Sequence, residues 1–397
     1  MFPNTAQSIK RSFTTHFSPP TLHPTLLTDE QHRIYAHGRM SALLALRPRL
    51  GVQRAADGVP VSIPLTTISR EGNFDASIEV QFPTASGQVR VSLLVDSGNS
   101  TMIIPYGENL AGAPRYTVLG ATCEPWGCRA DVMKGPVQII TSDGSTYQID
   151  SCVFYACIAN NADGKRTANF GTGRISPWSA NEWNTHDGLG VTIQSPLSYN
   201  TAYPYAEFVY APAETIFSST ATPHVNEGSL LILHATRPSG FTMLEIIPNL
   251  GWKYVVPAAF AIGSTASAWP GSIASPIAMV DTGGGPVFLS DPNGAVWREA
   301  WPDPVRCPLW TGKNSRNCNC VSDRLTLSLK GSDGKTSYTY TIDTSAMPAS
   351  VQGLTAVMCE LNGCMMGQAG MNIGGITALF NRILIDYVGT QLRFAPK

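Results

Sequence analysis

Two segments of this 397-residue chain carry the same short pattern, an apolar strand that ends in an aspartate, a hydroxyl residue and a glycine. The first reads VSLLVDSGN and contains Asp96, and the second reads IAMVDTGGG and contains Asp281. The copies lie 185 positions apart (281 minus 96), about the length of one domain. One Asp-Ser-Gly turn is weak evidence, but two in matching context predict a duplicated lobe with one carboxylate from each half.

Two carboxylates that face one another have a chemistry that neither has alone. Like charges at short range cannot both ionise cheaply, so Asp96 and Asp281 would share a proton and titrate as a unit. One then acts as a base and the other as an acid, which suits the attack of water on an amide carbonyl. Two coincidental aspartate turns are the simpler alternative. The residues that complete the pattern are Ser97, Gly98, Thr282 and Gly283. Each glycine is expected to let the backbone bend close beneath the carboxylate.

The composition restricts the class of protein. Charged residues make up 14% of the chain and the formal net charge is −1, which argues against a nucleic-acid partner. No apolar run is long enough for a membrane-spanning helix. The 36 glycines and 29 prolines indicate a turn-rich, mainly β protein. No motif indicates a cofactor, and the cysteine and histidine spacings argue against a metal site.

The N-terminal segment, residues 1–60, differs from the rest of the chain. It contains a proline-rich stretch and then a predicted helix over residues 28–49, with Thr28 as its N-cap. Strand-length apolar segments follow, and Asp143-Gly144 marks the turn of a predicted hairpin. The pattern over residues 172–225 assigns no element.

The nine cysteines favour disulfides, and hence an oxidising compartment, over buried thiols or zinc ligands. Three pairs share the spacing C-x4-C, at 123/128, 152/157 and 359/364, while three more cysteines lie at 307, 318 and 320. The spacing alone does not fix how the last five pair. The disulfide candidates are Cys123, Cys128, Cys152, Cys157, Cys318 and Cys359.

The paired VDSGN and VDTGG segments resemble the two catalytic loops of the pepsin-like aspartic peptidases. The C-terminal segment NIGGITALFNRILIDYVGTQLRFAPK is similar to that family's closing segment through its apolar-Gly pair Ile373-Gly374. NFGTGRISP is similar to the first-lobe counterpart, with the pair Phe170-Gly171. SDGS resembles the flap tip of the plant-type, nepenthesin-like branch, whose propeptide the N-terminal helix resembles. The likeness covers most of residues 66–397.

This resemblance implies a mainly β, bilobal fold of two six-stranded-type lobes with a cleft between them. It predicts a propeptide-like segment over 1–60, an N-terminal lobe over 66–235 and a C-terminal lobe over 236–397. Asp96 and Asp281 would be the catalytic dyad, and Ser97 and Thr282 the hydroxyls that interlock the lobes. The hairpin over 140–147 would be the flap over the substrate, with the residues Thr141, Ser142, Asp143, Gly144, Ser145 and Tyr147.

The sequence departs from the family beside the dyad. Asn99 and Gly284 stand where the family usually has the hydroxyls that bond the outer carboxylate oxygens, and Thr141 stands in place of a flap tyrosine. Asn99 could still donate from its side-chain amide, whereas Gly284 has no side chain.

The resulting expectation is a monomeric, acid-active aspartic endopeptidase that hydrolyses peptides or proteins and is made as a zymogen inhibited by its own N-terminal segment. It would be secreted or reside in a vacuolar or lysosome-like compartment. Two alternatives stay open. One is a pepsin-fold binding or inhibitor protein with weak or no catalysis, and the other is an enzyme that uses the dyad on a small molecule.

Overall fold

The computed structural model describes residues 52–397 with gaps. The gaps are 54–57, 71–72, 85–86, 106, 111, 124–127, 162–163, 165, 174–184, 187–190, 218–223, 248–252, 264, 268–276, 285–286, 291–304, 307–317, 323, 346, 348–355 and 360–369. The predicted helix over 28–49 and most of the propeptide-like segment lie outside the described residues.

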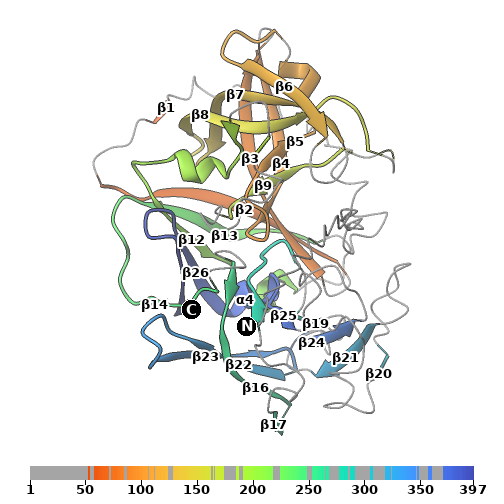
Figure 1. Ribbon diagram of the computed structural model, residues 1–397, viewed down its shortest axis with the longest axis vertical. Coiled ribbons are helices and arrows are strands. Elements are labelled where there is room, and N and C mark those ends of the chain that lie inside the picture. Colours follow the sequence, from red (N-terminus) through yellow and green to blue (C-terminus); the bar gives the residue numbers. More distant parts are fainter. Residues whose placement is uncertain are drawn as a thin grey trace, which may run out of the picture.

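One large sheet holds most of the N-terminal half and, unexpectedly, the C-terminal strands as well (Figure 1). Its hydrogen-bonded order is β14-β27-β26-β12-β13-β2-β3-β4-β9-β5-β8-β7-β6, with β1 added beside β8. The strands are β1 (Val52–Gln53), β2 (Val61–Arg70), β3 (Asn73–Thr84), β4 (Gly87–Asp96), β5 (Met102–Ile104), β6 (Thr117–Cys123), β7 (Arg129–Ile140), β8 (Thr146–Cys157), β9 (Asn169–Gly171), β12 (Tyr205–Val209), β13 (His224–His234), β14 (Thr242–Met243), β26 (Asn381–Asp386) and β27 (Gln391–Pro396).

The rest of the C-terminal half forms two further sheets, in the orders β15-β18-β25-β19-β24-β21-β20 and β17-β16-β22-β23. Their strands are β15 (Tyr254–Val255), β16 (Pro257–Ile262), β17 (Thr265–Ser267), β18 (Ile277–Met279), β19 (Val287–Ser290), β20 (Val305–Arg306), β21 (Cys318–Ser322), β22 (Arg324–Lys330), β23 (Ser337–Asp343), β24 (Ala356–Cys359) and β25 (Gly370–Asn372). The remaining described elements are short: η1 (Gly107–Leu110), η2 (Pro196–Tyr199), α2 (Ala213–Ile216), α4 (Ile376–Phe380) and the pair β10 (Thr185–His186) and β11 (Val191–Thr192).

The side-chain pattern explains how these strands pack. Along β23, buried and exposed positions alternate, as expected for a sheet with one face on the core. The short strands β9, β18 and β25 are buried at every position, so they lie inside the molecule rather than at an edge. The prediction of a mainly β fold is therefore confirmed.

The strands β2, β12, β13 and β26 lie between the upper and lower parts of the molecule in Figure 1. β26 pairs with β12 in antiparallel register, so the last part of the predicted C-terminal lobe is built into the sheet of the first half. The predicted boundary at 235/236 falls between β13 and β14, and β2 begins at Val61, before the predicted start at 66. The division into lobes stays a prediction.

A buried carboxylate ties three of these strands together. Glu207 on β12 accepts from Arg382 Nε on β26 at 2.6 Å and contacts His234 Nε2 on β13 at 2.7 Å. Burial by itself raises the pKa of Glu207, but the bonds to His234 and Arg382 outweigh it and hold that pKa below its ordinary value. The charge is therefore compensated where the two halves share a sheet.

We expect Glu207→Leu to lower the free energy of unfolding by about 3 kcal/mol at pH 7, because it leaves the Arg382 guanidinium without its buried counter-charge. Urea unfolding followed by circular dichroism measures this change. Glu214→Gln on α2, where the side chain is exposed, is the matched control and should stay within about 0.5 kcal/mol of the parent. A loss below about 1 kcal/mol for Glu207→Leu would contradict the assigned role.

Candidate active site

The internal repeat predicted from the sequence is present in the topology. β9 runs parallel to β4 and antiparallel to β5, and β25 stands in the same relation to β18 and β19. The register also repeats, because Asn169 lies opposite Leu94 and Asn372 lies opposite Met279, each two residues before the aspartate. Asp96 and Asp281 therefore occupy equivalent places at the ends of equivalent buried strands.

The two aspartate loops hold one another through a symmetric pair of hydrogen bonds. The backbone N–H of Ser97 donates to Thr282 Oγ1 at 2.9 Å, and the backbone N–H of Thr282 donates to Ser97 Oγ at 2.9 Å. The Ser97 hydroxyl donates in turn to the carbonyl of Val280 at 3.2 Å. Ser97 and Thr282 are fully buried, so these bonds fix the two loops in register.

The two glycines allow the carboxyl groups to approach the opposite loop. A Cβ atom on Gly98 would lie 2.5 Å from Asp281 Oδ1, and one on Gly283 would lie 2.7 Å from Asp96 Cγ. The sequence predicted that each glycine lets the backbone bend beneath its own aspartate. The structure shows that each glycine makes room for the aspartate of the other loop.

Each carboxylate accepts one hydrogen bond from its own loop and one from a neighbouring strand. Oδ1 accepts from a backbone N–H, which comes from Asn99 at 3.2 Å for Asp96 and from Gly283 at 3.1 Å for Asp281. Oδ2 accepts from a side-chain amide at 3.0 Å, which is Asn169 Nδ2 for Asp96 and Asn372 Nδ2 for Asp281.

The sequence prediction missed these two asparagines. The available signal was the repeat Asn-apolar-Gly at 169–171 and 372–374, of which only the apolar-Gly part entered the prediction. The Asn99 side chain was predicted to donate to Asp96, but its amide donates instead to Thr101 O and to Asn169 Oδ1.

Asp96 is an unusually weak acid in this setting. Its pKa is raised from 3.8 to about 7, first because burial disfavours the charged form and next because the negative charge of the nearby Asp281 disfavours a second one. The amide of Asn169 and the ammonium group of Lys253 act in the opposite direction. A carboxyl that keeps its proton beside a second carboxyl is the arrangement required for paired acid and base chemistry.

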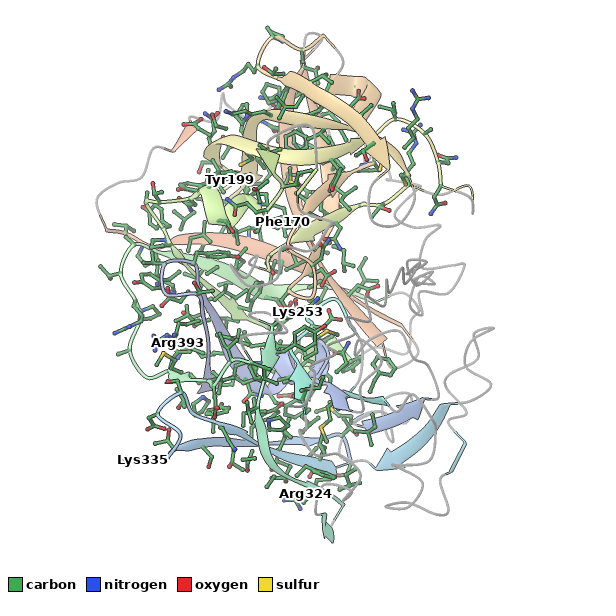
Figure 2. All side chains as sticks on the ribbon, viewed as in Figure 1. Phe170, Tyr199, Lys253, Arg324, Lys335 and Arg393 are labelled. Carbon is green, nitrogen blue, oxygen red and sulfur yellow. The ribbon has the colours of Figure 1, made fainter. Side chains whose placement is uncertain are left out.

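Lys253 is a second residue that the sequence prediction missed. It lies just before β15, and its Nζ donates to the carbonyl of Gly98 in the first aspartate loop. The ammonium group also lies 5.7 Å from the ring centroid of Tyr254. Figure 2 shows Lys253 between the upper and lower parts of the molecule. A cation from the C-terminal half thus adds to the contacts that hold the N-terminal loop.

The hairpin of β7 and β8 forms as predicted, with Gly144 at φ +80° in its turn. Its tip, however, bonds to the first part of β2: the backbone N–H of Ser142 donates to Ser62 O at 2.9 Å, and the Ser142 hydroxyl does so at 3.1 Å. Asp143 Oδ1 accepts from Thr141 Oγ1 at 2.6 Å and from Ser145 Oγ at 2.7 Å, which stiffens the turn. The role of this hairpin as a flap stays a prediction. These contacts argue against it because they attach the tip of the hairpin to β2.

Tyr147 belongs to the core of the first half. Its hydroxyl donates to Asn200 Oδ1 at 2.8 Å, and its ring packs edge-on against Tyr203 with centroids 5.6 Å apart. Burial raises the pKa of Tyr147 to about 12. Only 4% of the residue is exposed, which leaves little surface for a substrate contact.

We expect Tyr147→Phe to lower the free energy of unfolding by about 1 kcal/mol, the typical value of one buried hydrogen bond. Because the ring does not reach the dyad loops through any of these contacts, the steady-state rate of peptide hydrolysis should change less than about twofold. Chemical unfolding and kinetics on the same preparation give both numbers. A large loss of activity without a loss of stability would instead support a role for Tyr147 in the flap.

The structure contradicts a disulfide at the candidates Cys152 and Cys157, which are both thiols. Both lie on β8, opposite Gly135 and Ala130 of β7, so five residues of extended chain separate their Cα atoms by about 16 Å and place the side chains on opposite faces. A disulfide needs Cα atoms within about 7 Å. The Cys152 thiol instead donates to Ile149 O at 3.7 Å.

The other cysteine predictions have mixed outcomes. Cys128 is a thiol here, with its sulfur 3.7 Å from Thr167 Oγ1, so the predicted bond to Cys123 is not formed. Cys123 lies opposite Arg129 rather than Cys128 in the β6–β7 register. Cys318 and Cys359 lie directly opposite one another on β21 and β24, a spacing compatible with a disulfide, and their bond stays a prediction.

Among the described residues, no group of three or more acidic, histidine or cysteine side chains could hold a metal ion. In that same part of the chain, no helix is long and apolar enough to cross a membrane.

Comparison with known proteins agrees with this topology. No family model matches the sequence, and no curated protein matches it. One similar solved structure is the crystal structure of the aspartic proteinase from Irpex lacteus, with a TM-score of 0.55 over 85% of this chain and 98% of that chain. The chain has a pepsin-like fold. The two sequences are 14% identical, so the likeness concerns the fold, and nothing in it points to the plant-type branch.

Proposed function

We propose that the chain is an aspartic endopeptidase that hydrolyses peptide bonds with Asp96 and Asp281. One observation carries the proposal: two equivalent carboxyl groups, one from each half, meet at loops that are interlocked by Ser97 and Thr282. The raised pKa of Asp96 supports it, because the pair then keeps a shared proton until the pH rises through about 7.

The chemistry follows from that single shared proton. The ionised carboxylate takes a proton from a water molecule bound between the two groups, and the water oxygen attacks the carbonyl carbon of the substrate. The protonated carboxyl gives its proton to the carbonyl oxygen, which yields a neutral tetrahedral diol. The diol then breaks its C–N bond as the nitrogen takes a proton from the dyad, while one diol hydroxyl gives its proton back to the dyad as the C=O bond re-forms. The dyad therefore ends with one proton again.

The proposed activity has a defined alkaline limit. Activity needs the shared proton, and Asp96 loses it as the pH rises through about 7. We expect kcat/KM to fall above that pH, and to fall again at low pH when both carboxyls are protonated.

We extend the proposal to a zymogen in an acidic, secreted or vacuolar compartment. Residues 1–60 carry several basic side chains, among them Arg33, Arg39, Arg47 and Arg49, which would be attracted to a cleft that bears a carboxylate pair. Protonation of carboxylates at acidic pH weakens such an attraction, so the segment would be released there.

The test is incubation of the purified chain with an unfolded protein substrate from pH 3 to 8, with and without the aspartic-peptidase inhibitor pepstatin. We expect the substrate to be cleaved and pepstatin to block that cleavage. At acidic pH, mass spectrometry should show that the chain has lost roughly its first 60 residues. The variant Asp281→Asn should show neither substrate cleavage nor this loss. An absence of cleavage over the whole range from a folded sample would contradict the proposal.

A further inference from the structure

The aspartate loops give the dyad no side-chain donor from the positions three residues after each aspartate. Those positions hold Asn99 and Gly284. Asn99 directs its side-chain amide away from the carboxylate, and Gly284 has no side chain. The outer oxygen of each carboxylate would therefore lack a side-chain donor if the loops alone had to supply it.

Two asparagines from other strands take that place. Asn169 on β9 donates to Asp96 Oδ2 and Asn372 on β25 donates to Asp281 Oδ2, both at 3.0 Å. They occupy the same register position in the two halves and are nearly fully buried. The arrangement is a built pair, repeated in the two halves of the chain.

The orientation of each amide is fixed by a donor on its oxygen. Asn372 Oδ1 accepts from the backbone N–H of Gly374 at 2.9 Å, so its Nδ2 must face the carboxylate. Asn99 Oδ1 accepts from the backbone N–H of Thr101 at 3.1 Å, which turns the Asn99 amide toward Asn169 Oδ1 at 3.0 Å. That contact turns the Asn169 amide toward Asp96.

Gly284 completes the argument. A Cβ atom at this position would lie 3.4 Å from Asp281 Oδ2 and 3.5 Å from Asn372 Nδ2. A side chain on residue 284 and the amide of Asn372 would therefore compete for the same space beside the same oxygen. The amide of Asn372 is therefore the side-chain donor to Asp281 Oδ2, and the absence of a side chain at Gly284 leaves room for it.

We propose that Asn169 and Asn372 are the positioning residues of the dyad, acting as an amide pair in place of loop hydroxyls. The inference rests on the proposed peptidase function. Each amide holds its carboxyl group in the plane that faces the opposite loop and stabilises the ionised form.

Within the part of the chain that the structure describes, the ionisable groups that face the pair from other elements are Lys253 before β15 and Tyr210 after β12. Neither changes when an asparagine is replaced, so a shift in titration can be assigned to the lost amide.

The test compares Asn169→Leu and Asn372→Leu, which keep the size of the side chain but remove the donor. We expect kcat/KM to fall ~10–100-fold in each, because a displaced carboxyl no longer holds water in line. Both limbs of the pH profile should move upward by about one pH unit, because the charged form loses a donor.

The matched control is Asn381→Leu, a buried asparagine that donates to Thr377 O at 2.9 Å and lies in the helix-to-strand connection after α4. It should lower the midpoint of thermal unfolding and leave both limbs of the pH profile in place. Equal shifts in all three variants would overturn the proposal.

A rescue experiment uses the competition at residue 284. In Asn372→Ala with Gly284→Ser, a hydroxyl can occupy the space of the lost amide, so we expect at least a tenfold gain in kcat/KM over Asn372→Ala and a pH profile close to that of the parent. Failure of the serine to restore either quantity in a folded double variant would count against the amide-for-hydroxyl replacement.

A second measurement separates this inference from the peptidase proposal and does not need activity. Carboxyl ¹³C NMR on aspartate-labelled protein follows the titration of the dyad, and Asn169→Ala is used if the leucine variant does not fold. We expect the apparent pKa of the pair to rise in the variant. An unchanged titration overturns the inference even if the parent cleaves peptides, whereas an inactive parent with a shifted titration overturns only the proposed function.

Discussion

Asp96→Asn is expected to abolish peptide hydrolysis, with kcat/KM reduced by at least ~10³-fold, because an amide can neither share the proton nor act as a base. The Asn99 backbone N–H and the Asn169 amide that bond the carboxylate stay in place, so the loss reports the chemistry rather than the fold. Cleavage of a peptide at pH 4 to 6 measures it. Activity above a tenth of the parent would contradict a catalytic role for Asp96.

The same substitution is expected to stabilise the protein at neutral pH. The folded pKa of Asp96 lies near 7, above its ordinary value of 3.8, so below about pH 4 both the folded and the unfolded chain carry the neutral group. Between pH 4 and 7 the unfolded chain loses the proton first, and the folded state becomes relatively less stable as the pH rises. A shift of that size corresponds to about 4 kcal/mol.

Urea unfolding at pH 4 and at pH 7.5 tests that sign. Between the lower and the higher pH, Asp96→Asn should gain about 4 kcal/mol of stability relative to the parent. Asp343→Asn is the matched control with the opposite sign, because the hydroxyl and backbone N–H of Ser345 hold the pKa of Asp343 below its ordinary value. That variant should be less stable than the parent at neutral pH. A stability gain for Asp96→Asn that is the same at both pH values would contradict the shared-proton arrangement.

The sequence predicts the centre of the site well, because the centre is encoded locally and twice. The pattern of apolar strand, aspartate, hydroxyl residue and glycine is visible within ten residues, and its repetition predicted both the partners and the interlock of Ser97 with Thr282. Even there, the role of the glycines changed. Only the three-dimensional arrangement shows that Gly98 lies against Asp281 rather than beneath Asp96.

The support around the dyad could not be predicted in the same way, because its donors come from distant parts of the chain. Asn169 lies 73 residues after Asp96, and Asn372 lies 91 residues after Asp281. No local pattern connects an amide on one strand with a carboxylate on its neighbour until the register of β9 on β4 is known. Lys253 was missed for the same reason, since its partner Gly98 is 155 residues away.

For several elements the sequence identified the local structure but did not specify its place in the fold. The Asp143-Gly144 turn does close a hairpin, but the place where its tip docks depends on β2, which the turn sequence does not specify. The C-x4-C spacing suggested small loops, whereas Cys152 and Cys157 lie on one continuous strand. The C-terminal strands were assigned to the second lobe, yet β26 completes the sheet of the first by pairing with β12.

Gly98→Ala is expected to lower kcat/KM by ~100-fold or more, because the new methyl group would displace the carboxyl group of Asp281 in the opposite loop. The new methyl group would lie 2.5 Å from Asp281 Oδ1, so either the Asp281 carboxyl rotates away from the Asn372 amide or the loop retreats and strains the Ser97–Thr282 bonds. Gly284→Ala is the matched comparison in the other loop, because its methyl group would meet no atom closer than 3.3 Å. That variant should lose less than about tenfold. Steady-state kinetics of the two variants, with circular dichroism to confirm folding, distinguish a clash with the opposite carboxyl group from a general intolerance of side chains in these loops. Equal losses in both would show that the loops tolerate no side chain for reasons other than the approach of the opposite carboxyl group.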